Sequence, residues 1–250
     1  MPLPDDVHCP TCQKWKRDHP AVVATMKARK IPPMETWFCK CPPDGAPVVD
    51  ERATQLLRYA NLPEHPDGPK TLENFTPRRG TEDAQAVSRE YAEGEASFRV
   101  LVLIGQAGTG KSHLLEAIAR SWLARRQVVK YEYVPQLLEH FRHAYDDEAG
   151  MAFLDVYDRY QAADLLVLDD LGAEVVTKWV AEKVTTLLDE RYRNGRYLAI
   201  GTNLTREDVA EAYHERLASR LWDVSSGTVR TVYLRATDYR ALGDGRRRQP

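Results

Sequence analysis

The segment Gly105–Ser112 carries the clearest chemical signal in the sequence. It reads GQAGTGKS and fits the pattern G-x-x-x-x-G-K-[ST] without deviation. Glycines let such a loop curl so that successive backbone N–H groups point at phosphate oxygens, and the following helix adds the positive end of its dipole. The lysine of this pattern reaches the β- and γ-phosphates of ATP, and the hydroxyl after it is a ligand for Mg²⁺. The predicted nucleotide-binding residues are Gly105, Gln106, Ala107, Gly108, Thr109, Gly110, Lys111, Ser112 and His113.

A pair of carboxylates follows a second apolar run. The sequence LLVLDD at Leu165–Asp170 delivers Asp169 and Asp170 at the carboxyl end of a strand, where ligands bind in open α/β sheets. We predict that Asp169 joins Ser112 as a Mg²⁺ ligand. Asp170 is expected to polarise the attacking water, because phosphoryl transfer requires mainly a positioned nucleophile and neutralised charge. Most proteins with this chemistry carry the longer Glu there, so Glu174 stays open as the competing base.

An amide side chain follows the next expected strand, Tyr197–Gly201. Asn203 stands two residues beyond the end of this strand. An Asn in such a place is commonly a turn residue. Its order after the glycine-rich loop and the carboxylate pair instead favours a place beside the γ-phosphate, where it would orient the lytic water. The predicted catalytic residues of these segments are Lys111, Asp169, Asp170 and Asn203.

Apolar strands alternate with amphipathic helices through the body of the chain. Phe98–Ile104 is a continuous apolar run with β-branched residues, typical of a central parallel strand buried on both faces. Strands joined in this way to helices by short connections require a mostly parallel sheet with helices on both faces. The fold class is therefore predicted to be α/β. The expected strands are Phe98–Ile104, Val128–Val134, Leu165–Leu168, Tyr197–Gly201 and Val229–Leu234, and the expected helices are Asp50–Tyr59, Thr81–Gly94, Leu114–Leu123, Pro135–Tyr145, Lys178–Arg193 and Tyr213–Trp222.

The cysteines gather at the beginning of the chain. All four fall in the first 41 residues, at Cys9, Cys12, Cys39 and Cys41. Two close pairs of thiolates in a module too small to hold a core are typical of a tetrahedral structural Zn²⁺ site. The second pair, C-x-C, is tighter than the usual C-x-x-C, so His8 or His19 stays open as a replacement for one thiolate. Free or redox-active thiols are the remaining alternative.

Charge and hydropathy limit the kinds of partner and the cellular location that we expect for the chain. The 35 basic and 37 acidic side chains give a formal net charge of −2, so no global positive field favours nucleic acid and any DNA contact must be local. The beginning of the sequence lacks the basic and apolar regions of a signal peptide, and its apolar runs are too short to span a membrane. We therefore expect a cytoplasmic protein.

With these residues placed, the chain resembles the AAA+ ATPases of the DnaC/IstB group, which comprises bacterial and phage replicative helicase loaders and transposition helper ATPases. The resemblance covers residues 50–240, and its segments taken in this order are specific to the group. The segments that carry it are Asn61–Pro63, Thr71–Phe75, Gly105–Ser112, Leu168–Gly172, Thr202–Leu204, Glu215–Leu221 and Asp238–Arg240.

The resemblance implies how subunits would meet. In ERLASRL at Glu215–Leu221, Arg220 matches the arginine finger of the family, and Arg216 lies one helical turn away. The chain would then self-associate through its Arg220 face. Residues 221–250 look like a strand and a tail instead of a helical bundle, so a full lid domain is expected to be missing.

The resemblance also implies partners and a division of the chain. A replicative DnaB-type helicase and single-stranded DNA are the partners of the loaders, and the cysteine-rich module favours a loader, because the transposition helpers typically begin with a helical region. An IstB-like helper that acts with a transposase on duplex DNA is the alternative. The expected parts are a zinc module at 1–48 that docks on the helicase, a helix and linker at 49–97, the ATPase domain at 98–240 and a basic tail at 241–250.

The cysteine pattern generates a prediction about metal content. Purified protein should contain about one zinc ion per chain, because structural zinc sites are closed and bind tightly. Elemental analysis of protein purified without chelators measures this ratio. Zinc-free protein that is folded and active would contradict the prediction.

Overall fold

The computed structural model describes residues 51–145 and 151–239. The predicted module at 1–48, with its four cysteines, and the predicted tail at 241–250 lie outside these residues. The chain divides into two compact units, Met1–Thr54 and Gln55–Pro250, and the fold described below is that of the second, except that its first helix begins at Glu51. Among the described helices, none has the length and apolar character needed to cross a membrane.

Strands and helices alternate along the described chain, as the sequence predicts. The strands are β1 (Val100–Gly105), β2 (Val129–Tyr133), β3 (Leu165–Leu171), β4 (Tyr197–Thr202) and β5 (Val229–Leu234). The helices are α2 (Glu51–Ala60), α3 (Glu82–Glu93), α4 (Lys111–Ala124), α5 (Val134–Tyr145), α6 (Met151–Ala162), α7 (Lys178–Arg193), α8 (Arg206–Ala212) and α9 (Glu215–Leu221), with a 3₁₀ turn at η3 (Val224–Ser226).

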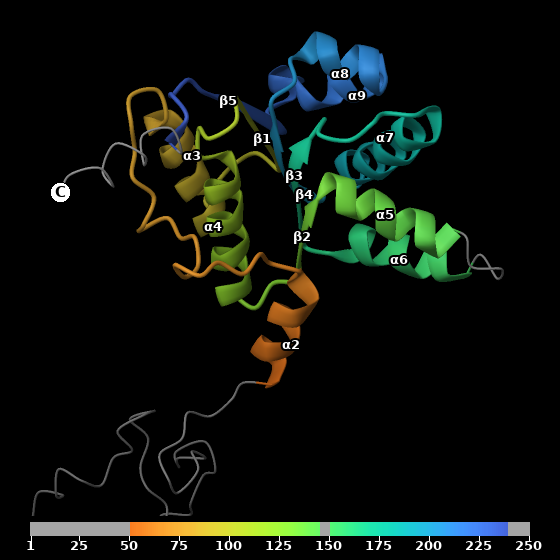
Figure 1. Cartoon of the computed structure of the whole chain (residues 1–250), viewed down its shortest axis with the longest axis horizontal. Coiled ribbons are helices and arrows are strands. Elements are labelled where there is room, and N and C mark those ends of the chain that lie inside the picture. Colours follow the sequence, from red (N-terminus) through yellow and green to blue (C-terminus); the bar gives the residue numbers. More distant parts are fainter. Residues whose placement is uncertain (1–50, 146–150, 240–250) are drawn as a thin grey trace, which may run out of the picture. The chain divides into compact units, whose positions relative to one another are not determined.

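The five strands form one sheet in the order β2-β3-β4-β1-β5, and all neighbouring pairs are parallel. The predicted parallel sheet is therefore confirmed. Helices α3 and α4 lie on one side of it, and α5, α6 and α7 lie on the other (Figure 1). Strand β4 is inserted between β1 and β3, so the carboxyl ends of these three strands lie side by side.

The core consists of two apolar layers, one on each face of the sheet. Successive side chains of a strand point to opposite faces. In β1, Leu101 and Leu103 accordingly belong to the layer under α3 and α4, whereas Val100 and Val102 belong to the layer under α5, α7 and α9. All four are fully buried. Burial on both faces explains why β1 is a continuous apolar run without polar alternation.

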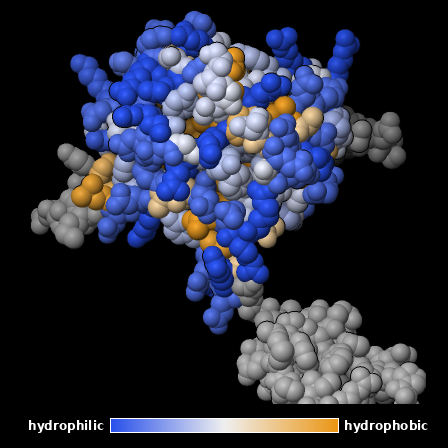
Figure 2. Space-filling view, turned by 180° about the vertical axis from the view of Figure 1, so that it is seen from behind, coloured by the Kyte–Doolittle hydropathy of each residue, from blue (hydrophilic) through white to orange (hydrophobic). Residues whose placement is uncertain are grey.

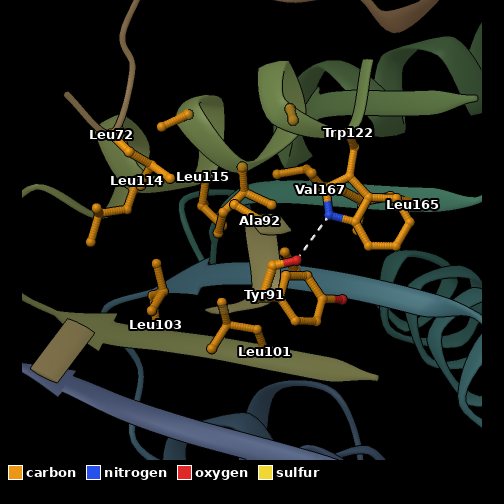
Figure 3. Close-up of a cluster of buried hydrophobic side chains, with 14 of the residues drawn as sticks. Leu72, Tyr91, Ala92, Leu101, Leu103, Leu114, Leu115, Trp122, Leu165 and Val167 are labelled. Atoms are coloured by element: carbon orange, nitrogen blue, oxygen red, sulfur yellow. Dashed lines mark hydrogen bonds between the residues drawn. The ribbon is translucent and has the colours of Figure 1, made fainter. Parts of the chain in front are cut away.

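The layer under α3 and α4 is closed by aromatic side chains. Tyr91 of α3 stacks on Phe98 at a centroid distance of 5.4 Å, and Trp122 of α4 donates its indole N–H to the Tyr91 carbonyl at 3.1 Å (Figure 3). The Tyr91 hydroxyl donates to the carbonyl of Arg99 at 2.7 Å. A buried aromatic ring with a satisfied polar end fixes α3 against both α4 and the sheet.

The connection after α2 is tied to α4 through one buried carboxylate. Glu116 is 2% exposed, and its two oxygens contact His65 at 2.6 Å, the backbone N–H of Lys70 at 3.2 Å and Arg120 at 2.7 Å. These contacts hold the connection against the helix that follows the glycine-rich loop. The segment after Lys70 is thereby placed beside that loop.

Two helices of the structure have no bounds in the sequence analysis. Helix α8 has only seven residues, but its capping box was readable, since Thr205 and Asp208 exchange side-chain and backbone hydrogen bonds. Helix α6 follows a stretch of charged residues that obscures its start. The helix predicted at Tyr213–Trp222 is shorter, because His214 in extended conformation caps α9 by accepting from the Arg216 N–H.

The surface on the face shown in Figure 2 is mostly hydrophilic, and apolar side chains appear there only in small separate patches. Isolated apolar residues on a surface are normal and indicate no binding site by themselves. The functional part of the molecule must therefore be sought in its cavities.

One buried arginine side chain joins three separate segments of the chain by hydrogen bonds. Arg191 of α7 is 0% exposed. Its guanidinium donates to the carbonyls of Tyr160 at 2.5 Å, Gln161 and Ala163 at 3.0 Å and Tyr197 at 2.7 Å. These carbonyls belong to the end of α6, the turn before β3 and the start of β4. Burial lowers the pKa of Arg191 to about 10, so the group stays charged at neutral pH.

The Arg191 contacts generate a stability prediction. Arg191→Met keeps much of the apolar volume but leaves four carbonyls without their donor. We expect the free energy of unfolding to fall by about 2–4 kcal/mol, because buried unpaired polar groups are costly. Denaturant unfolding of the purified chain measures the change. The matched control is Arg193→Met on the exposed side of α7, which should change it by less than about 0.5 kcal/mol; equal effects would contradict the prediction.

Candidate nucleotide-binding site

The glycine-rich loop lies where the sequence predicts it, between a strand and a helix. Gly105 is the last residue of β1, and Lys111 is the first residue of α4. Gly108 and Gly110 adopt φ angles of 74° and 107°, which side chains other than glycine's rarely allow. The loop thus depends on glycine at these two places to turn from the strand into the helix.

Lys111 is held across the base of the loop. Its side chain is buried, with the residue 6% exposed, and its Nζ donates to the carbonyls of Gly105 at 2.8 Å and Gln106 at 3.1 Å. The Thr109 hydroxyl donates to the same Gln106 carbonyl at 2.8 Å. The ammonium group is therefore fixed against the loop backbone, where it adds a full positive charge to a site suited to phosphate.

Asp169 and Ser112 form a donor set for a cation. Oδ2 of Asp169 accepts from the Tyr131 hydroxyl at 2.8 Å, and Oδ1 is buried with no hydrogen-bond partner among the described residues. Burial raises the pKa of Asp169, while the hydroxyls of Ser112 and Tyr131 oppose this rise. A buried carboxylate oxygen in need of a partner, next to a hydroxyl, suits a hard divalent cation. Ser112 and Asp169 therefore fit the predicted magnesium site.

Asp170 faces the cavity, whereas Glu174 is engaged elsewhere. Asp170 has a φ of 62°, in the left-handed region, and it follows Asp169 where the register between β3 and β4 shifts. Strained backbone of this kind is common at functional sites. Oε2 of Glu174 accepts from the Gly172 N–H at 3.1 Å, and its Oε1 accepts from the Tyr213 hydroxyl. The geometry therefore favours Asp170 over Glu174 as the group that meets water.

Asn203 lies at the shared edge of the three central strands. Thr202 ends β4 and pairs with Ile104 of β1 on one side and with Leu171 of β3 on the other. The buried Thr202 hydroxyl donates to the Leu171 carbonyl at 2.7 Å and accepts from the Leu204 N–H at 3.0 Å. These bonds fix the backbone on both sides of Asn203, whose side chain is exposed. The strand that precedes Asn203 thus neighbours the strand of the carboxylate pair, whereas Asn203 is not among the residues that line the cavity described next.

A cavity of about 520 Å³ opens over the loop. The loop, Asp170 and the start of α4 form one wall of it. The opposite wall comes from the connection that precedes α3, whose segment Thr71–Phe75 is noted above only as part of the family resemblance. Phe75 packs edge-on against His113 at a centroid distance of 5.1 Å. The lining residues are Lys70, Asn74, Phe75, Thr76, Arg78, Ala107, Gly108, Thr109, Gly110, Lys111, Ser112, His113, Asp170 and Tyr239.

His113, predicted as a nucleotide-binding residue, is fixed by the backbone of the opposite wall. Its Nε2 lies 2.8 Å from the Thr71 carbonyl, so this nitrogen carries the proton and donates it. Burial lowers the pKa of His113. The imidazole is therefore expected to be neutral at pH 7, and it contributes packing and orientation to the cavity without a charge.

A strap after β5 closes the cavity; we use this name for residues 235–239. The Tyr239 N–H donates to the Gly108 carbonyl at 3.0 Å. Arg78 donates to the carbonyls of Thr237 at 2.9 Å and Gly108 at 3.4 Å, and its guanidinium lies 5.2 Å from the centre of the Tyr239 ring. The strap therefore covers the loop from a part of the chain far away in sequence. In the sequence, the strap was indicated only by the segment Asp238–Arg240, which is part of the family resemblance.

The two arginines of α9 lie apart from this cavity. Arg216 and Arg220 line a separate cavity of about 220 Å³ together with Tyr192, Ser219 and Asp223. Both arginines pair with Asp189 of α7. The structure of one chain thus does not bring Arg220 together with Lys111 and Asp170, as expected of a residue that acts on a neighbouring subunit.

Comparison with known proteins identifies a family and several relatives of the chain. Residues 48–241 match the family described as IstB-like ATP binding protein. The protein XkdC of the phage-like element PBSX in Bacillus subtilis is 30% identical over 208 residues, which cover 77% of this chain and 73% of XkdC. The replicative helicase loader DnaC of Escherichia coli K12 is 24% identical over 143 residues, which cover 57% of this chain and 58% of DnaC.

Solved structures share the fold. The crystal structure of the DnaC helicase loader aligns with a TM-score of 0.56 at 21% identity, over 66% of this chain and 97% of that one. Domain III of the replication initiation protein DnaA from Thermotoga maritima aligns with a TM-score of 0.60 at 21% identity, over 74% of each chain. The DnaA protein of Thermomicrobium roseum is matched over only 33% of its length.

The Tyr131 contact generates a prediction about the carboxylate of Asp169. Tyr131→Phe removes the hydroxyl that donates to Oδ2 of Asp169 at 2.8 Å. We expect the free energy of unfolding to fall by about 1–2 kcal/mol, because a buried acceptor loses its donor. Thermal or denaturant unfolding in the presence of a chelator measures this without bound cations.

The neighbouring strand position supplies a matched control. Tyr133 lies on the same strand but is exposed, so Tyr133→Phe should change the free energy of unfolding by less than about 0.5 kcal/mol. If Tyr131→Phe proves as stable as the parent chain, Tyr131 does not hold Asp169 in place.

Proposed function

The chain belongs to the family of IstB-like ATP-binding proteins of the AAA+ type, and on this premise we propose that it is an ATP-dependent helicase loader. It binds a replicative hexameric helicase and helps to deposit it on single-stranded DNA. The ATPase activity in this proposal is supported by one observation. Lys111, Ser112 and Asp170 line the same cavity, and the carboxyl group of Asp169 interacts with Ser112.

Each of these side chains has a distinct task in ATP hydrolysis. Lys111 and the N–H groups of the loop bind the phosphates and neutralise their charge. Ser112 and Asp169 would hold Mg²⁺, which would withdraw charge from the phosphates. Asp170 accepts a hydrogen bond from the attacking water, and Asn203 orients that water from the end of β4. The strained backbone of Asp170 aims its short side chain into the cavity.

Arg220 acts on the nucleotide of a neighbouring subunit. Its place outside the nucleotide cavity of its own chain supports this role. A guanidinium group that reaches a γ-phosphate only when subunits pack makes hydrolysis conditional on assembly. Self-association through the Arg220 face of α9 follows from the same role.

The loading function has its support in the relatives of the chain. DnaC of Escherichia coli is a replicative helicase loader by name, and the chain spans 58% of its length. The cysteine-rich segment at 1–48 adds to this support, since a zinc module suits a docking element that needs a rigid surface without a core of its own. We propose Cys9, Cys12, Cys39 and Cys41 as its zinc ligands and the helicase as its partner.

A basic cavity supports contact with single-stranded DNA. It measures about 580 Å³ and lies between α2, β2, α5 and α6. The side chain of Lys130 projects over the Tyr59 ring at 4.1 Å from its centre, where cation and aromatic face stabilise each other. Phosphates of a DNA strand are the anions that a local cluster of this kind attracts. The basic side chains of the cavity are Arg58, Lys130, His140, His143 and Arg159.

The second candidate is a helper ATPase that acts with a transposase on duplex DNA. The match of residues 48–241 to the IstB-like family favours it specifically. Both functions use the same nucleotide site, so mutation of that site does not separate them. The two candidates are distinguished only by the protein that each would bind.

The nucleotide site generates a prediction that tests the ATPase itself. Lys111→Ala should lower nucleotide affinity and turnover by about 100-fold or more, because the phosphates lose their buried positive charge. Asp170→Asn should bind ATP normally and lose about 100-fold in turnover, because the attacking water loses its acceptor. Binding of a fluorescent ATP analogue and release of phosphate are measured side by side. Lys178→Ala, at an exposed lysine, is the control, and full turnover by Lys111→Ala would refute the assignment.

The partner is tested by capture. The full chain should be retained by the immobilised replicative helicase of the same cell and not by a transposase. A chain without residues 1–48 should still bind ATP and no longer be retained, because the docking module is gone. If only the transposase captures the chain, the protein is a transposition helper and not a loader. If the helicase captures the shortened chain, the docking surface lies in the ATPase domain and not in residues 1–48.

A further inference from the structure

Asp189 of α7 holds both arginines of α9. The residue is 6% exposed. Its Oδ2 accepts a hydrogen bond from Nη2 of Arg216 at 2.6 Å, and its Oδ1 lies 2.6 Å from Nε of Arg220. One carboxylate on the neighbouring helix thus neutralises two guanidinium groups that lie one helical turn apart.

The two arginines use different ends of their side chains. Arg216 is bound through a terminal nitrogen, which occupies part of the fork that would grip a phosphate. Arg220 approaches through Nε, and because its N–H is not aligned with the oxygen, neither Nε of Arg220 nor Oδ1 of Asp189 has a hydrogen-bond partner among the described residues. The contact to Arg220 is therefore purely electrostatic, and it leaves the terminal fork out of the pair.

The aromatic ring of Tyr192 completes the support of Arg220. The guanidinium carbon of Arg220 lies 4.8 Å from the centre of this ring. Tyr192 is itself fixed, since its hydroxyl donates to Asp223 at 3.2 Å. Arg220 is thus held from two sides at the rim of a cavity of about 220 Å³, with its side chain 31% exposed.

We propose that Asp189 is a positioning residue for Arg220. It holds the guanidinium by its Nε side on the Tyr192 ring, so that the terminal nitrogens are presented to the γ-phosphate of ATP on a neighbouring subunit. The inference rests on the proposed function, in which Arg220 acts between subunits. The proposal also gives the two arginines different roles. Arg216 donates a hydrogen bond from a terminal nitrogen to Asp189 and so holds the carboxylate in place.

Two physical effects follow from the loss of this carboxylate. A long arginine side chain that is no longer held must be ordered anew each time it meets a phosphate, which opposes the transition state. In addition, like charges one helical turn apart repel each other when nothing neutralises them. Arg220 would therefore leave the Tyr192 ring, although every group that binds ATP in its own chain stays in place.

The test is a double-mutant comparison in the full-length chain, with ATP turnover measured over a range of protein concentrations. Asp189→Asn should lower kcat by about tenfold, with the KM for ATP and the affinity for a fluorescent ATP analogue unchanged. Arg220→Ala should lower kcat further. The decisive value is that of the double variant, which should be no lower than that of Arg220→Ala alone, because the carboxylate acts only through the arginine.

The controls separate positioning from folding. Glu182→Gln removes an exposed carboxylate of the same helix α7, which pairs with Lys183 instead of an arginine, and it should keep most of the turnover. Tyr192→Leu removes the ring under Arg220 and leaves the charges, so it should lower kcat several-fold, again without effect in the Arg220→Ala background. This second variant also tests the proposal if Asp189→Asn does not fold.

The outcomes distinguish this inference from the function on which it rests. If Arg220→Ala keeps full turnover, the role of Arg220 between subunits is wrong and Asp189 has nothing to position. If Arg220→Ala loses turnover while Asp189→Asn keeps it, or if the two losses multiply in the double variant, only the role of Asp189 is overturned. Mixing Arg220→Ala with Lys111→Ala should restore part of the activity, which confirms separately that Arg220 acts on another subunit.

Discussion

The insertion of β4 between β1 and β3 in a fully parallel sheet is the constraint on which the site depends. Parallel strands end at the same edge of a sheet, so the glycine-rich loop after β1, the end of β3 with Asp169 and Asp170, and the end of β4 before Asn203 lie at one edge, although 98 residues separate Gly105 from Asn203. Strands β1, β3 and β4 are buried on both faces, so a slip by one residue would turn each of their apolar side chains to the wrong layer. The core thereby fixes the register, and the register fixes the site.

Buried polar side chains show which groups serve the fold and which serve chemistry. Arg191 and Glu116 are almost fully buried, and each is surrounded by several partners. Most polar atoms of these two groups are bonded to other segments of the chain, so the groups tie the fold together. Asp169 is equally buried, but one of its oxygens has no hydrogen-bond partner within the described chain. Burying a carboxylate oxygen without a partner costs free energy, and a bound cation would offset this cost by supplying the missing contact.

The cavity over the loop shows how segments outside the sheet complete the site. Phe75 reaches it from the connection before α3, which Glu116 holds through Lys70, and Tyr239 reaches it from the strap after β5. Arg78 joins the two, since it donates to the backbone of both the strap and the loop. A ligand bound in the cavity would therefore contact a segment that precedes β1 and a segment that follows β5.

The sequence by itself determined the elements and the chemistry of their ends. The glycine pattern of Gly105–Ser112, the apolar run before Asp169 and the bounds of α7 and β5 were all readable, because phosphate binding and burial on both faces each require particular residues at particular spacings. Helix α6 was given no bounds, because charged residues interrupt its pattern. Asn203 could be proposed only from its order in the chain, since an Asn after a strand has many uses.

Only the tertiary structure decided which partner each of these residues has. The support of Asp169 by Tyr131, the engagement of Glu174 by Tyr213 and the pairing of Asp189 with Arg216 and Arg220 all join residues far apart in sequence. No local spacing signals such contacts, because they arise where strand order and helix packing bring separate elements together. A residue's type limits its chemistry, whereas its neighbours decide whether it is free to carry that chemistry out.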